Sequence, residues 1–206
     1  MSRRLAAVVS AALASLAFPA AAQTIEAPAP GIRRHDGFYL NLQTGPAYLA
    51  LSQDSADMTI SGTGYGLNVA VGGSPVENLV IFGEVISQVA LGPTLEVGGE
   101  EYESDDSVSL SFAHIGPGLA YYFGESSFFL SGSVGLAQAA LESNVGKSGA
   151  QGVGLRLGAG KEWWVGDQWG LGVGANFFTA SMTDDSNEEI ELGATSFALH
   201  FSATFP

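Results

Sequence analysis

The sequence predicts an all-β fold, an eight-stranded antiparallel up-and-down transmembrane β-barrel, and three observations lead to this prediction. In eight segments, apolar residues alternate with smaller or more polar ones at a period of two, which is the period of a β-strand. The connections between these segments are alternately long and short. The composition also fits, because 46% of the 206 residues are hydrophobic, 28 are glycine and none is cysteine.

The first 22 residues have the three parts of a secretory signal peptide. Arg3 and Arg4 form a basic start, an apolar run follows at 5–18, and small residues precede a cleavage site after Ala22. The run is shorter than the roughly 20 residues that a membrane-spanning helix needs. We therefore expect export with a cleaved signal peptide over 1–22, a proline-rich polar leader over 23–36, and a barrel domain over 37–206.

The strands follow one another from residue 37 onward. The segment GFYLNLQT at 37–44 alternates Phe38, Leu40 and Leu42 with more polar residues, and GYGLNVAVGG at 64–73 alternates large apolar residues with glycine, asparagine and alanine. The same period predicts further strands near 79–91, 107–123, 128–141, 151–164, 169–181 and 192–205. After the signal peptide no stretch reaches 18 consecutive apolar residues, which excludes a helical membrane protein.

The connections give the order of the strands in space. They cover approximately 51–62, 74–78, 92–106, 124–127, 142–150, 165–168 and 182–191, beginning with a long one. An up-and-down barrel has this pattern when its two ends meet different compartments. Both chain termini then lie at the end that carries the short connections.

The two faces of each strand show which face meets lipid. On 151–164 and 169–181 one face carries large apolar residues, and the opposite face is mostly glycine with Arg156 and Asn176. A soluble barrel filled by glycine would have almost no core, so we expect the apolar face to point outward into lipid. Glycine on the inner face leaves room for larger inward neighbours such as Tyr39 and Phe82.

Aromatic residues gather at the strand ends beside the short connections, as in the interfacial girdle of a membrane barrel. Eleven of the 21 aromatic residues lie there: Phe38, Tyr39, Tyr121, Tyr122, Phe123, Phe128, Phe129, Trp163, Trp164, Trp169 and Phe205. In 107–123, however, Val108, Leu110 and Phe112 occupy the inward positions. We expect a β-bulge near the GPG sequence at 116–118 that exchanges the two faces.

Three segments carry a family resemblance: GFYLNLQTGPAY at 37–48, GPGLAYYFG at 116–124 and FALHFSATF at 197–205. With the signal peptide, they make the chain resemble the small eight-stranded outer-membrane β-barrels of Gram-negative bacteria. This type occurs in the membrane domain of outer membrane protein A and in opacity-type, porin-like proteins. The resemblance implies a place in the outer membrane and contact with outer-membrane lipids and lipopolysaccharide. It also implies insertion by the barrel-assembly machinery, which reads a terminal aromatic residue, here Phe205 before Pro206.

Polar and ionisable residues at inward positions predict a polar network in the lumen. Its members are Glu84, Gln88, Arg156, Glu162, His114 and His200. In the first hypothesis they form a plug, in which Glu84 and Glu162 compensate Arg156, because buried charges at membrane depth must be paired. In the second, Glu84 and Arg156 line a narrow channel for ions or small solutes, although eight strands leave little room for water.

A third hypothesis is a lipid-modifying enzyme. His200 and Ser202 are two residues apart on one strand and share a face, and Glu84 could orient the histidine. This His–x–Ser spacing is a weak signal, and the face points inward. No metal-ligand spacing or nucleotide fingerprint occurs, so we predict no catalytic site, no metal site and no cofactor.

The long connections hold 14 of the 21 acidic residues and one basic residue, Lys147. The simplest interpretation is a solvated surface. The alternative is a divalent-cation site, which could bridge to lipopolysaccharide phosphates. Its candidate ligands are Glu100, Glu101, Glu103, Asp105, Asp106, Asp184, Asp185, Glu188 and Glu189. With 7 Lys+Arg against 21 Asp+Glu and a net charge of −14, nucleic acid is excluded as a partner.

Together these observations predict a monomeric, non-enzymatic protein of the outer membrane with a plugged interior and acidic external loops. Its expected role is in cell-envelope integrity or surface interaction, and its leader lies in the periplasm. A soluble, secreted barrel of lipocalin type is the remaining structural alternative, because the apolar bands are short and interrupted by glycine.

Overall fold

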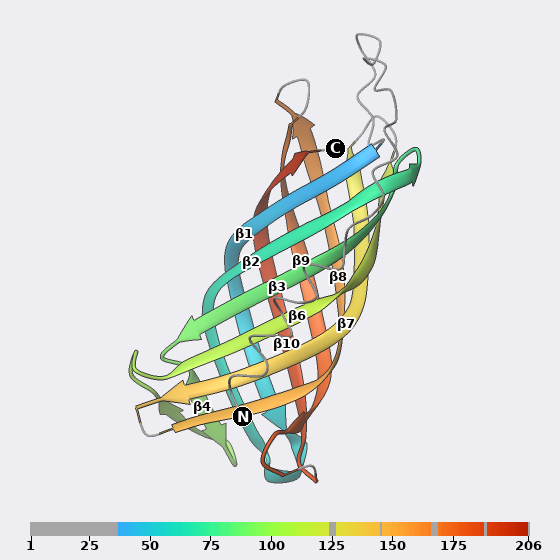
Figure 1. The fold of residues 1–206 in the computed structure, drawn as a ribbon. Coiled ribbons are helices and arrows are strands. Elements are labelled where there is room, and N and C mark those ends of the chain that lie inside the picture. The colour runs from blue at the N-terminus through green and yellow to red at the C-terminus, as the bar shows by residue number, and fades with distance from the viewer. Residues whose placement is uncertain (1–36, 124–126, 145, 166–168, 188, 206) are drawn as a thin grey trace. The chain divides into compact units, whose positions relative to one another are not determined.

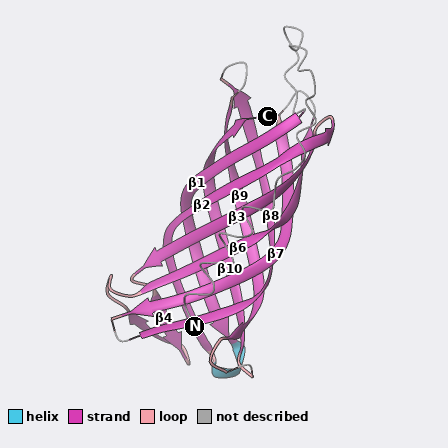
Figure 2. Ribbon diagram, in the orientation of Figure 1, coloured by secondary structure: helices cyan, strands magenta, loops and turns pink. Residues whose placement is uncertain are grey.

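The computed structural model describes residues 37–123, 127–144, 146–165, 169–187 and 189–205. The predicted signal peptide at 1–22 and leader at 23–36 lie outside these described residues. Nearly all of the described chain is β-strand (Figure 2). Among the described residues no helix has both the length and the apolar character needed to cross a membrane.

Eight long strands form the barrel (Figure 1). They are β1 (Gly37–Gln53), β2 (Met58–Val76), β3 (Leu79–Leu91), β6 (Ser109–Phe123), β7 (Phe128–Ser143), β8 (Gly146–Trp164), β9 (Gly170–Asp184) and β10 (Glu191–Phe205). Each pairs antiparallel with its neighbours in the chain, and β1 also pairs with β10, with Leu40 opposite Phe205. The sheet is therefore closed, as predicted, and no long strand has a free edge.

The ends of the barrel differ in what they carry. Both barrel termini and the connections at 77–78, 124–127 and 165–169 lie at one end, which we call the turn end. The other end, the loop end, carries a 3-10 turn (η1, Asp54–Ala56) and a hairpin of β4 (Thr94–Val97) and β5 (Glu100–Glu103). The hairpin continues the sheet beyond β2, with Met58 opposite Val97.

Two of the loop-end connections are much shorter than predicted. The first is 54–57 instead of 51–62, and the third is 144–145 instead of 142–150. The strands simply continue: β2 and β8 each have 19 residues. A membrane-crossing strand needs only about 9–11 residues, so both strands extend well past the lipid.

The outer wall has an apolar belt next to the turn end. On β8 the belt runs from Trp163 to Val153, about 33 Å along the strand and roughly 25 Å along the barrel axis at a tilt near 40°. That height matches the apolar band of a membrane barrel. Large apolar side chains are exposed on every long strand, including Leu42, Leu67, Val85, Ile115, Leu136, Leu155, Phe177 and Leu199.

Beyond the belt, toward the loop end, the polarity of the wall is reversed. The outward positions become small or polar, namely Ser61, Thr63, Ser111, Gln138, Gln151, Thr179, Ser181 and Thr195. The inward positions at these levels become apolar and form one buried cluster that includes Leu49, Ile60, Leu110, Phe112, Phe178 and Met182. We call this projecting part, with its apolar interior and polar exterior, the rim.

This reversal explains why the predicted bulge near 116–118 is wrong. The β3–β6 pairing is continuous from Leu91–Ser109 to Leu79–Tyr121, so the faces are not exchanged. Leu110 and Phe112 point inward because they belong to the apolar interior of the rim. The pattern of alternation shifts by one residue where the environment changes from lipid to water, while the backbone register does not shift.

Candidate functional site in the barrel interior

A buried ion pair occupies the middle of the barrel. The Arg156 side chain on β8 donates from Nε to Oε1 of Glu84 on β3 at 2.8 Å and from Nη2 to Oε2 at 2.9 Å. Both residues are almost fully buried, with 1% and 2% exposure. The two bonds join the guanidinium fork to both oxygens of one carboxylate, which is the geometry that a buried pair needs.

Polar side chains from four further strands complete this ion pair. Arg156 Nη1 donates to Ser131 Oγ at 2.9 Å and to Asn176 Oδ1 at 3.2 Å. Glu84 accepts from Asn68 Nδ2 at 3.0 Å and from the Ser133 hydroxyl. Asn176 in turn donates to Gln43 Oε1 at 2.9 Å, so the network reaches β1, and strands β1, β2, β3, β7, β8 and β9 all contribute to it.

The other predicted lumen residues lie at different places in the interior. His114 joins the central network, with Nε2 3.2 Å from Ser133 Oγ and 3.9 Å from Glu84 Oε1. Gln88 lies nearer the loop end and accepts from Ser196 Oγ at 2.7 Å.

Glu162 lies six residues nearer the turn end on β8 than Arg156 and belongs to a second polar cluster. Thr204 Oγ1 donates to its Oε1 at 2.6 Å, and Tyr122 donates to the same oxygen at 3.3 Å. Asn41 extends the cluster by donating to Thr204. Glu84 alone makes the bidentate contact with Arg156, so the expected sharing of Arg156 between two carboxylates is replaced by two separate clusters.

The structure does not assemble the predicted Ser–His pair. His200 and Ser202 are both buried, but neither ring nitrogen of His200 and not the hydroxyl of Ser202 has a hydrogen-bond partner among the described residues. Glu84, the expected orienting acid, bonds with Arg156, Asn68 and Ser133. A nucleophile without a base in contact is not activated, so this part of the interior offers no catalytic unit.

Apolar layers close the polar interior on both sides. Toward the turn end lies a cluster of Tyr39, Ala70, Val80, Phe82, Ala120, Tyr122 and Phe129. Toward the loop end lies the apolar interior of the rim. Three of the eleven aromatic residues predicted for the girdle, Tyr39, Tyr122 and Phe129, therefore point inward, whereas Phe38, Trp163 and Trp169 are exposed on the outer wall.

Inward glycines make room for the large interior side chains, as predicted. A Cβ atom at Gly154 would lie 2.7 Å from the Phe178 ring, and one at Gly158 would lie 2.5 Å from Arg156 Nη1. The same holds for Gly118 beneath Phe82, at 2.4 Å. Each large residue thus fills the space above a glycine on a neighbouring strand, or on its own strand for Arg156, and the interior is packed although half of its wall has no side chain.

The acidic residues at the loop end are spread over separate segments. Glu100, Glu101 and Glu103 are exposed on β5, and Asp105 accepts from the amide of Ser107 at 2.8 Å. Asp184 accepts from the amide of Ser186 at 2.8 Å, and Asp185 from Gln151 at 2.8 Å. Asp106 and Glu189 are exposed, and Glu188 lies outside the described residues.

Within the part of the chain that the structure describes, no three His, Cys, Asp or Glu side chains come together to hold a metal ion. Local hydrogen bonds act on single loop groups instead. Bonds from the hydroxyl and amide of Ser107 lower the pKa of Asp105, and the hydrogen bond to Glu100 raises the pKa of Tyr102.

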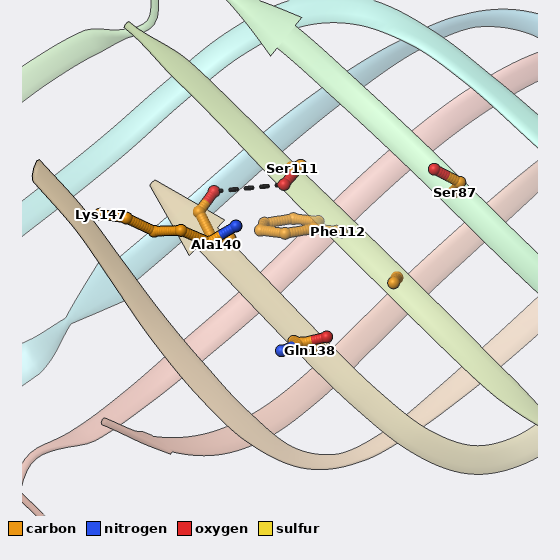
Figure 3. Close-up of a pocket in the computed structure, with 7 residues that line it drawn as sticks. Ser87, Ser111, Phe112, Gln138, Ala140 and Lys147 are labelled. Atoms are coloured by element: carbon orange, nitrogen blue, oxygen red, sulfur yellow. Dashed lines mark hydrogen bonds between the residues drawn. The ribbon is translucent and has the colours of Figure 1, made fainter. Parts of the chain in front are cut away.

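A shallow groove of about 160 Å³ lies on the outer wall between β3 and β8 (Figure 3). Ser87, Ser111 and Gln138 line it with Lys147, and Ser111 donates to the carbonyl oxygen of Ala140 at 3.4 Å. Lys147 forms an ion pair with Glu142. The lining holds no histidine and no carboxylate, so its serine hydroxyls have no general base of these types beside them.

A closed antiparallel barrel with an apolar outer belt and a polar, plugged interior is a membrane-spanning β-barrel. The chain matches the outer membrane protein beta-barrel domain family over residues 9–205 and belongs to that family. It is therefore an outer-membrane barrel, and we assign the turn end to the periplasm because the short turns of such barrels lie there. No curated protein matches the chain.

Solved structures show the same fold. Neisserial surface protein A has a TM-score of 0.56 at 16% identity, covering 82% of this chain and 97% of that chain. The attachment invasion locus protein of Yersinia pestis has a TM-score of 0.49 at 12% identity, covering 82% and 99%. OprG from Pseudomonas aeruginosa has 0.47 at 14%, covering 85% and 99%. At such identities the likeness concerns the fold alone.

Proposed function

We propose that this chain is a non-enzymatic, non-conducting outer-membrane barrel that anchors an acidic surface outside the cell, with a role in envelope integrity or surface interaction. The observation that carries the proposal is the closed interior. The Glu84–Arg156 network lies between two apolar layers, each of which crosses the full width of the barrel.

The alternative is a narrow channel, and the two apolar layers argue against it. An ion moving through the barrel would lose its water at Phe112, Phe178 and Met182 and find no polar group there to replace it. It would then meet Arg156, whose fork is already bonded to Glu84. Opening a path would require breaking a buried ion pair, which costs about 3–5 kcal/mol when one partner is left alone.

Conductance in planar lipid bilayers tests the proposal. We expect the purified chain to give no steady current steps in 1 M KCl, and we expect the same of Lys147→Gln, a control at the surface of the loop end. The variant Phe112→Ala/Phe178→Ala/Met182→Ala removes much of the rim plug and should increase the rate of transient openings. Steady, unitary steps from the unaltered chain would contradict the proposal and favour the channel.

A further inference from the structure

An apolar groove lies on the lipid-facing wall next to the turn end. It has a volume of about 460 Å³ and is lined by the exposed side chains of Phe123, Phe128, Leu130, Ala159 and Val173. The groove runs across β6, β7, β8 and β9, where Phe128 pairs with Lys161 and Leu130 with Ala159. Small Ala159 and Gly160 form its low part between larger neighbours.

A lysine stands at this groove. Lys161 lies with its ammonium group 4.3 Å from the centre of the Phe128 ring and 5.7 Å from that of Trp163. Three basic residues occur among the described ones: Arg156 inside the barrel, Lys147 at the loop end, and Lys161. Lys161 is thus the one positive charge that the described outer wall presents at the level of the turn-end aromatic girdle.

From this arrangement we infer that the groove is a binding site for one phospholipid of the periplasmic leaflet with an anionic headgroup. A fatty acyl chain occupies the apolar groove, and the lipid phosphate contacts the Lys161 ammonium. The depth is suitable, because aromatic girdles lie at the level of the lipid headgroups. The charge is suitable as well, since a lysine beside a membrane attracts anionic lipid.

The aromatic contacts explain why the site would select a lipid instead of merely touching the bilayer. A lysine side chain near a membrane interface can usually adopt many conformations. The rings of Phe128 and Trp163 restrict Lys161 by cation–π contact and hold its ammonium group above the apolar groove. The positions for the phosphate and for the acyl chain are therefore fixed relative to each other before the lipid binds.

Native mass spectrometry of the full chain released from detergent micelles tests this inference. The probes are phosphatidylglycerol and phosphatidylcholine with identical acyl chains, added in equal amounts. We expect one retained lipid and about a fivefold preference for phosphatidylglycerol, the ratio that corresponds to roughly 1 kcal/mol for one lysine. Lys161→Gln should bring the ratio close to one, and Lys147→Gln should leave it unchanged.

A second pair of variants tests the groove itself. Ala159→Leu fills its low part and should reduce retention of both lipids several-fold, whereas Ala203→Leu makes the same change on β10, outside the groove lining. A preference for phosphatidylglycerol that persists in Lys161→Gln would overturn the phosphate contact. Equal retention by Ala159→Leu and Ala203→Leu would overturn the groove. Each variant is first checked for the folded barrel by its migration on an unheated gel.

Discussion

Arg156 and Glu84 are the residues whose loss the interior can least tolerate. Arg156 is held by Glu84, Ser131 and Asn176, and Glu84 also accepts from Asn68 and Ser133. Glu84→Gln leaves a buried guanidinium without its carboxylate, and Arg156→Met leaves a buried carboxylate without its cation. We expect each single variant to lower the free energy of unfolding in lipid vesicles by about 3–5 kcal/mol.

The double variant Glu84→Gln/Arg156→Met should be more stable than the sum of the single changes predicts, because no unpaired charge remains. The exposed pair of Glu142 and Lys147 is a matched control. Its loss in Glu142→Gln should cost about 0–1 kcal/mol, since water already solvates both groups. Additive effects of Glu84→Gln and Arg156→Met would show that the two residues do not stabilise each other.

Inward glycines give a second prediction at this scale. Gly154→Ala places a Cβ atom 2.7 Å from the Phe178 ring, so we expect a loss of about 1–3 kcal/mol in the free energy of unfolding. Adding Phe178→Leu should restore part of it. Gly83→Ala, on the outer wall with nothing within 4 Å of the added atom, should change the stability by less than about 0.5 kcal/mol. Equal effects at both glycines would contradict the packing argument.

Single strands show how far the sequence could predict the structure. Where a strand crosses lipid, alternation located it well: the outward Leu155 and Leu157 and the inward Arg156 on β8 are as predicted. Where the strand leaves lipid, the apolar residues change sides. On β8 this happens between Val153, which is outward, and Ala150, which is buried inside. A pattern that changes phase resembles the end of a strand or a bulge, so the predicted loops were too long.

The rim predicts a sharp difference in water access along one strand. The chain has no cysteine, so single cysteines can be labelled cleanly. On β9, Ser181→Cys is outward in the rim, Val173→Cys is outward in the apolar belt, and Met182→Cys is inward. With a charged maleimide added to the reconstituted barrel, we expect rapid labelling of Ser181→Cys and at least about tenfold slower labelling of the other two variants, because the reagent does not enter lipid or a packed apolar interior.

Each outcome of this labelling has a separate meaning. An unreactive Ser181→Cys would place the rim inside the bilayer and contradict the two-zone wall. A reactive Met182→Cys would show that water enters the interior of the rim, and it would also weaken the proposal of a non-conducting barrel. Labelling after unfolding in urea is the control that all three thiols are intact.

At the scale of the whole barrel, sequence and structure agree best on the separation of environments. The strand order, closure and the outward apolar belt followed from periodicity and connection lengths. The contact between Glu84 and Arg156 was predicted, but its partners Ser131, Ser133 and Asn176 depend on which strands face each other across the lumen. Periodicity places a residue on a face and gives no information about the side chain opposite, so those contacts needed the structure.

The same separation gives the barrel a strongly asymmetric electric field. The described acids at the loop end lie on η1–β2, the β4–β5 hairpin and the 184–191 segment, with Lys147 already paired to Glu142. Charges within about 10 Å add together at 0.1 M salt. Glu100, Glu101 and Glu103 on the projecting hairpin are fully exposed, so a cationic partner arriving from outside meets them early.

We therefore expect fluorescent poly-lysine to associate quickly with the barrel in phosphatidylcholine nanodiscs at low salt. Changing Glu96, Glu100, Glu101 and Glu103 together to glutamine should slow the association rate by roughly tenfold, because electrostatic attraction acts mainly on that rate. The difference between the two proteins should shrink as NaCl rises to 0.5 M, where the charges are screened. Glu77→Gln removes an exposed charge at the turn end and should leave the rate nearly unchanged. If the four-glutamine variant associates as fast as the unaltered chain at low salt, the hairpin does not direct cationic partners to the barrel, and the surface-interaction part of the proposed function loses its support.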